Sequence, residues 1–164
     1  MVEKRQLKIV SGGQTGVDRA ALDVALALEI LHGGWCPKGR RAEDGRIPDQ
    51  YQLQESDARD YSVRTEQNVI DSDATLILFR SKVTGGTRLT QHLASKHAKP
   101  QMRIDLQQAD SQQQLEIAET SISSWLTEHK VKVLNIAGPR ESSNPGIHRQ
   151  AMDFLRVVLA GLKD

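Results

Sequence analysis

The sequence predicts an α/β fold in which a mainly parallel sheet of about five strands is covered by helices on both faces, giving three layers. Two observations indicate this class. Short apolar segments alternate along the chain with longer segments of helical spacing, and the continuous apolar run at 74–79 is typical of a central strand buried on both faces. The length of 164 residues suits one domain, so we expect residues 1–164 to form a single unit.

Five segments are predicted as strands because each is a short apolar run. They lie at 7–10, 34–36, 74–79, 101–104 and 132–136. Since 7–10 and 74–79 both lead into glycine-rich loops, we expect these two strands to be neighbours at the centre of the sheet. The polar region 37–62, which is punctuated by prolines and glycines, is interpreted as an excursion from the sheet.

Helices are predicted between the strands, at 17–31, 65–71 and 88–97, and in two further segments that open near Ser111 and Asn144. Thr15 is expected to be the N-cap of the first helix, with Asp18 completing a capping box. Ser111 and Gln114 form a second capping box. Asn144 followed by Pro145 is typical of an N-cap and a first helical residue.

Composition and charge restrict the class of protein. A formal net charge of +1 argues against bulk electrostatic attraction to nucleic acid or to an anionic membrane. No apolar run approaches the roughly 20 residues that span a bilayer, and the first six residues leave no room for a signal peptide. Cys36 is the single cysteine and cannot form an internal disulfide. We therefore expect a cytoplasmic protein without nucleic-acid or membrane partners.

Three glycine-rich loops follow strands at the sheet edge where open α/β sheets bind ligands. Glycine lets the backbone approach a ligand closely, and the N–H groups of a helix N-terminus favour an anion. Threonine hydroxyls add hydrogen-bond donors, and an arginine fork suits phosphate. We therefore expect a phosphate-bearing, nucleotide-like ligand. The candidate binding residues are Gly12, Gly13, Gln14, Thr15, Gly16, Thr84, Gly85, Gly86, Thr87, Gly138 and Arg140.

Other interpretations of the same residues stay open. The glycines also fit simple tight turns, and the loops match neither the dinucleotide fingerprint nor the Walker loop. Asp18 fits a helix cap as well as a contact to a ribose or a metal. Cys36 fits a small buried hydrophobe as well as a soft metal ligand. The five histidines lack the spacing of a metal site, and we predict neither a metal site nor catalytic residues.

Four motifs occur in order along the chain, and together they resemble the molybdenum carrier family. They lie at 11–19, 34–40, 84–87 and 135–142, and the likeness runs from about 7 to 160. That family is related to the molybdenum cofactor carrier proteins of algae. It belongs to a Rossmann-like superfamily that includes the lysine-decarboxylase-like phosphoribohydrolases.

The resemblance implies a Rossmann-like fold, a homo-oligomer (dimer or tetramer) and a binding site for molybdenum cofactor or a related ligand. Leu22, Leu26 and Ile30 lie off the main apolar stripe of the first helix and would suit such an oligomer, although burial within the monomer would cover them equally well. The leading hypothesis is a carrier of molybdenum cofactor, a pterin with a terminal phosphate. An enzyme acting on a nucleotide or phosphoribosyl compound and a nucleotide sensor are the alternatives.

The phosphoribohydrolase relatives differ in one loop. Their phosphate loop resembles Pro-Gly-Gly-x-Gly-Thr with a catalytic glutamate shortly after it, whereas residues 83–90 lack the proline and one glycine, and Thr90 stands in place of the glutamate. A hydroxyl cannot replace a carboxylate in acid–base chemistry. We therefore predict no cleavage of nucleoside monophosphates, with Glu66 or Glu141 as the residues that could stand in.

Overall fold

The computed structural model describes residues 6–163. The expectation that the first six residues leave no room for a signal peptide therefore lies largely outside the described residues. The main sheet contains five strands in the order β2-β1-β9-β7-β8, and every neighbouring pair is parallel. These strands are β1 (Lys8–Val10), β2 (Leu31–Gly33), β7 (Ala74–Phe79), β8 (Gln101–Asp105) and β9 (Val133–Ala137). The predicted Rossmann-like α/β class is confirmed.

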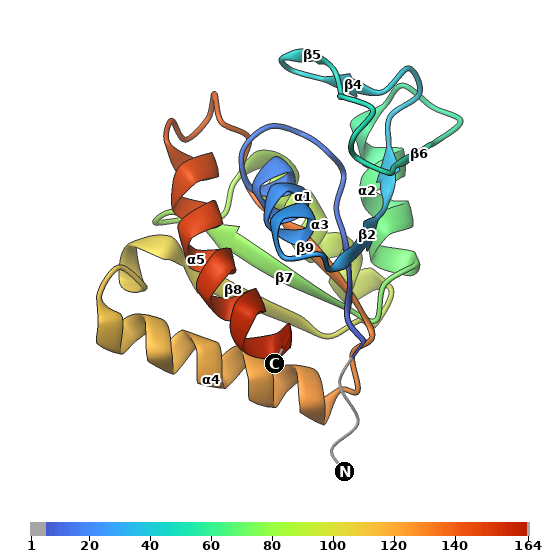
Figure 1. The fold of residues 1–164 in the computed structure, drawn as a ribbon. Helices are drawn as coiled ribbons and strands as arrows, with labels where there is room; N and C mark the ends of the chain where they lie inside the picture. Colours follow the sequence, from blue (N-terminus) through green and yellow to red (C-terminus); the bar gives the residue numbers. More distant parts are fainter. Residues whose placement is uncertain (1–5, 164) are drawn as a thin grey trace.

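Helices cover the sheet on both faces (Figure 1). The large core cluster joins the sheet to three of them, α1 (Val17–Ala27), α4 (Gln112–Glu128) and α5 (Ile147–Lys163). On the other face, α2 (Tyr61–Ile70) packs beside α3 (Gly85–Lys96) around Val69 and Leu93. Within residues 6–163, no helix has both the length and the apolar character that crossing a membrane requires.

The predicted pairing of β1 with β7 is wrong, because β9 lies between them. Ile9 is in register with Leu134, and Thr75 is in register with Asn135. The three central residues of β9 are buried, which suits a strand covered on both faces. Its polar member, Asn135, keeps this position because its side-chain amide donates to the Thr75 hydroxyl at 3.3 Å.

The first helix is shorter than predicted. It ends at Ala27, and Glu29 adopts a positive φ of 56°, which turns the chain out of the helix. Leu31 therefore begins strand β2, upstream of the strand expected at 34–36. The chain leaves the main sheet at Gly34, whose φ is 126° and where a Cβ would lie 2.3 Å from the Ser11 carbonyl oxygen.

The excursion predicted at 37–62 is present and contains three short strands, with a fourth, β3 (Trp35–Cys36), directly before it. β3 pairs with β6 (Gln54–Glu55), and β4 (Arg41–Ala42) forms a hairpin with β5 (Gly45–Arg46). A 3-10 turn, η1 (Leu106–Gln108), follows β8.

The excursion packs onto α1 through a second core cluster, in which Cys36, Ile47 and Tyr51 bury Leu22. Cys36 is fully buried among these side chains. Leu22 is buried and Ile30 partly buried within the monomer, while Leu26 is 38% exposed.

Candidate functional site

A cleft of about 160 Å³ opens at the carboxyl edge of the sheet. The loops after β1, β7 and β9 form it together with the first half of α2. Eight of the eleven predicted binding residues line it, namely Gly12, Gln14, Thr84, Gly85, Gly86, Thr87, Gly138 and Arg140. The three loops thus meet at one site, as expected for strands whose carboxyl ends share an edge.

Gly13, Thr15 and Gly16 lie outside this cleft. A Cβ on Gly13 would meet the side chains of Leu53 and Ile47 at 2.7 and 2.9 Å, and one on Gly16 would lie 2.2 Å from the Pro139 carbonyl oxygen. Both glycines have a positive φ near 80°. They are required by the turn and by the packing around it.

The N-terminus of α3 faces the cleft with its peptide groups accessible. Thr84 is the N-cap, but its side chain makes no capping hydrogen bond, and the first turn carries no acidic residue. A Cβ on Gly85 or Gly86 would meet nothing within 4 Å, so packing explains neither glycine. The positive φ of Gly85, 54°, favours glycine at that position, whereas Gly86 has no such requirement. The first N–H groups of a helix have no intrahelical acceptor, and this terminus is therefore suited to an anion.

The N-terminus of α1, in contrast, is covered by the loop after β9. Its N-cap is Gly16, not Thr15 as predicted, and no side chain caps it. The Val17 N–H instead donates to the Pro139 carbonyl at 3.1 Å. The loop after β9 therefore occupies the position where an anion was expected at the first helix, which leaves α3 as the helix N-terminus that faces the cleft with free N–H groups.

Arg64 is the buried cation of the cleft. Its Nη1 donates to the Gly12 carbonyl at 2.6 Å and lies 3.6 Å from a carboxylate oxygen of Asp18. Its guanidinium also lies 5.4 Å from the ring centre of Tyr61. Burial raises the pKa of Asp18, and the Arg64 charge opposes this shift. The pair therefore places both an acceptor and a fixed positive charge at the cleft wall.

Arg64 and its neighbours on α2 were not among the predicted binding residues. The helix was expected to begin at 65, whereas Asp60 caps it through the Ser62 N–H at 2.8 Å, so that Arg64 lies inside it. The sequence signal for this site was the pair of polar residues Arg64 and Asn68, which are spaced one helical turn apart. The structure shows that both lie on the buried face of α2. Asn68 fixes α2 against β3, because its side chain bonds both the N–H and the carbonyl of Trp35.

Thr90 also lines the cleft, and its hydroxyl donates to the Gly86 carbonyl at 3.1 Å. The two residues that could replace a glutamate there lie elsewhere. Glu66 bonds Lys96 and His97 on the outer side of α2 and α3. Glu141 accepts from the N–H groups of Gly146 and His148.

These bonds show that Glu141 caps the start of α5. The predicted cap, Asn144, and Pro145 both precede the helix, which begins at Ile147. The bonds from the His148 and Gly146 N–H groups lower the pKa of Glu141.

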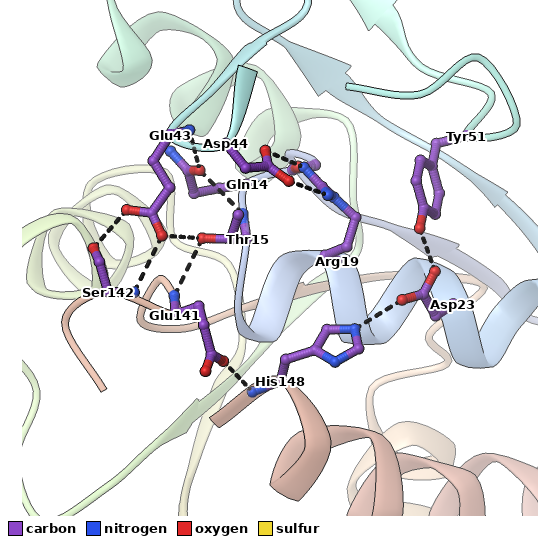
Figure 2. Close-up of polar contacts among 11 residues, drawn as sticks. Gln14, Thr15, Arg19, Asp23, Glu43, Asp44, Tyr51, Glu141, Ser142 and His148 are labelled. Atoms are coloured by element: carbon purple, nitrogen blue, oxygen red, sulfur yellow. Dashed lines mark hydrogen bonds and ion pairs between the residues drawn. The ribbon is translucent and has the colours of Figure 1, made fainter. Parts of the chain in front are cut away.

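A polar network lies beside the cleft, where the β4–β5 hairpin meets the loops after β1 and β9 (Figure 2). Its centre is Glu43, which accepts hydrogen bonds from the Thr15 hydroxyl and from the N–H and hydroxyl of Ser142. Asp44 pairs with Arg19 through two bonds of 2.9 and 3.1 Å. This network, and not the cleft, accounts for the polar groups of Thr15.

A second part of the network joins the excursion to α5 through Asp23. Its two carboxylate oxygens contact the Tyr51 hydroxyl and, at 2.8 Å, the His148 Nε2. Burial and the bond to Asp23 raise the pKa of Tyr51 to about 12. Among the described residues, histidine, cysteine and carboxylate side chains nowhere gather in a group of three that could hold a metal ion.

The comparisons with known proteins agree with the motifs. A family model for the circularly permutated YpsA SLOG family matches residues 9–159. The crystal structure of a "Putative molybdenum carrier protein" from Syntrophus aciditrophicus SB is similar with a TM-score of 0.89 and 51% sequence identity, covering 96% of this chain and 98% of that one. None of the curated proteins matches the chain. The resemblance inferred from the four motifs is thereby confirmed.

Proposed function

The chain belongs to the circularly permutated YpsA SLOG family, and from this premise we propose that it is a binding and carrier protein for a phosphate-bearing ligand such as molybdenum cofactor. The name of the similar crystal structure supports a molybdenum-related cargo. The observation that carries the proposal is the uncapped N-terminus of α3, where Gly85 and Gly86 leave open space in a cleft that also holds Arg64 and Arg140.

The size of the cleft favours a particular placement of the ligand. Pockets that enclose a drug-sized molecule measure roughly 300–1,000 Å³, whereas this cleft measures about 160 Å³. A phosphate group fits within it, while a pterin or nucleoside must extend beyond it. The N–H groups of α3 and the guanidinium of Arg64 then hold the phosphate, and Arg140, whose side chain is 48% exposed, reaches the part that extends outward.

A substitution at Gly86 tests this placement. Gly86 has neither a positive φ nor a close neighbour, so Gly86→Val leaves the fold intact and fills the space in front of the α3 N-terminus. We expect the affinity for inorganic pyrophosphate, measured by calorimetry, to fall by about tenfold or more, the loss of one charge-assisted contact. His92→Val places the same side chain on the exposed part of α3 and is expected to bind normally. Equal affinity of both variants would contradict the proposal.

The identity of the cargo is tested separately. Native mass spectrometry of the protein purified from its own host is expected to retain a pterin mass. A retained nucleotide mass would favour the sensor or the enzyme instead.

The prediction that nucleoside monophosphates are not cleaved rests on Thr90. Chromatography of AMP incubated with the protein is expected to yield no free base. Turnover near one per second or faster would favour the enzyme.

We also propose that the protein is cytoplasmic and forms a dimer or tetramer. The exposed apolar side chains Leu26 of α1 and Val157 of α5 support self-association. Light scattering at micromolar concentration is expected to give a multiple of 18.2 kDa, and a species of monomer mass alone would contradict it.

A further inference from the structure

The β4–β5 hairpin places its tip, Glu43 and Asp44, on two of the three loops that were predicted from sequence to bind phosphate, those after β1 and β9 (Figure 2). Glu43 accepts from the hydroxyls of Thr15 and Ser142 and from the Ser142 N–H, which is 3.1 Å away. The Arg140 guanidinium lies 3.9 Å from the same carboxylate. Two hydroxyls, one peptide N–H and one guanidinium therefore converge on a single anion.

Such a set of donors is the kind that binds a phosphate oxygen. Partial burial raises the pKa of Glu43, but the hydrogen bonds from Ser142 and Thr15 outweigh this effect and hold it below its usual value. The donors thus favour the charged form of whatever group they surround. We call Thr15, Ser142 and Arg140 the anion nest.

The tip and the base of the hairpin are held by separate contacts, so the tip can move away from the loops while the base remains in place. Among residues 6–163, the two strands of the hairpin pair only with each other and are separate from the main sheet. The base is held by buried Arg40, whose guanidinium donates to the carbonyls of Ile47, Pro48 and Tyr51. The tip contacts the protein body through the side chains of Glu43 and Asp44 and through the Glu43 N–H, which donates to Gln14.

We propose that the anion nest is a second anion subsite, that Glu43 occupies it in place of a ligand group, and that the hairpin tip is displaced when a ligand with two linked anionic groups binds. Arg140 belongs both to the nest and to the cleft lining, so the two subsites are adjacent. A diphosphate places one group at the α3 N-terminus and the other in the nest. The inference rests on the proposed function for the first of these two groups only.

The test uses ¹⁵N NMR of the whole chain titrated with inorganic pyrophosphate. Glu43→Ala empties the nest, and the Ser142 N–H reports on it directly. Asp49→Ala is the matched control, because Asp49 is an exposed carboxylate that pairs with Arg46 at the hairpin base and does not reach the nest. Glu43→Gln, which keeps the size of the side chain, separates loss of charge from loss of the side chain.

In Glu43→Ala we expect the Ser142 N–H signal to shift saturably and pyrophosphate to bind about tenfold more tightly than in the wild type, as expected when a competing charge-assisted contact is removed. Glu43→Gln is expected to give a smaller gain in the same direction, and Asp49→Ala none. Shifts at Gly86 and Thr87 without any at Ser142 in Glu43→Ala would overturn the nest and leave the proposed function standing.

Two further outcomes distinguish the proposals. A shift at Ser142 in Glu43→Ala with none at Gly86 or Thr87 would support the nest and refute binding at α3. No shift at any of these positions would overturn both.

Discussion

Replacing Arg64 by methionine tests whether the cleft wall depends on a buried ion pair. Arg64 Nη1 lies 3.6 Å from the Asp18 carboxylate, and the two side chains are only 8% and 11% exposed. The substitution keeps most of the apolar volume, removes the bond to the Gly12 carbonyl and leaves Asp18 without its nearest positive charge. Breaking one partner of a buried pair typically costs about 3–5 kcal/mol, a large share of the roughly 5–15 kcal/mol that stabilises a domain.

Burial raises the pKa of Asp18 above its ordinary value of 3.8, so the folded state favours the protonated carboxyl. The resulting contribution to stability is fully present below the pKa of the unfolded chain and is lost as the pH rises through the higher pKa of the folded state. Arg64 opposes the shift, so its removal raises the folded pKa further. The free-energy loss in Arg64→Met is therefore expected to be larger at about pH 8 than at about pH 5.

Urea unfolding at both pH values measures these free energies. The double variant Arg64→Met with Asp18→Asn removes the unpaired charge, and we expect it to recover a substantial part of the loss. A loss below about 1 kcal/mol in the single variant, the size of an exposed pair, would refute the reasoning, as would a double variant that is no more stable.

Three further predictions concern packing and protonation. Gly138→Ala would bring a Cβ within 2.2 Å of the Leu78 carbonyl oxygen, so thermal unfolding should show a loss of roughly 1–3 kcal/mol or more; an unchanged midpoint would contradict it. Glu141→Gln should weaken the start of α5 by about 1 kcal/mol near neutral pH. Because the hydrogen bonds lower the pKa of Glu141 from its ordinary 4.5, urea unfolding should show this difference shrink as the pH falls from 4.5 through the lower pKa of the folded state, and a constant difference would be inconsistent with the cap. Tyr51, with its pKa raised from 10 to about 12, should contribute stability that is lost as the pH rises through this range; alkaline unfolding followed by circular dichroism should show this loss in the wild type and not in Tyr51→Phe.

The helices and strands were largely predictable because the apolar spacing and the capping residues that define each one lie within its own segment of the sequence. Strand β7 lies at 74–79 as expected from its continuous apolar run, and the Ser111 hydroxyl accepts from the Gln114 N–H at the start of α4. Strand order was not predictable in the same way. The central strand of the sheet is β9, although its sequence contains the polar residue Asn135. Asn135 can be buried at this position because its side chain bonds Thr75 on the adjacent strand β7, a contact that the local sequence does not indicate.

The site was predicted in part for the same reason. Loops that follow parallel strands meet at one edge, so eight of the eleven binding candidates line the cleft. Thr15 and Gly16 lie outside the cleft because their surroundings come from distant segments, namely Glu43 of the hairpin and Pro139 of the loop after β9. Arg64, one of the least certain arginines from sequence, was not included among the candidates. It lies on the inward face of a helix, and its partners, Gly12 and Asp18, are distant in sequence.

The position of β9 also affects how the chain can fold while it is being synthesised. On the ribosome, β1 and β7 emerge well before residues 133–137, yet the strand that joins them in the sheet is the last to appear. Until then the two halves, β2-β1 and β7-β8, each expose an unpaired edge of backbone N–H and carbonyl groups. Pairing across such long sequence separations is slow, and nascent chains with open strand edges are prone to aggregation. We therefore expect the chain to depend on chaperones during synthesis. We also expect a polypeptide that ends at about residue 130 to be unable to complete the sheet.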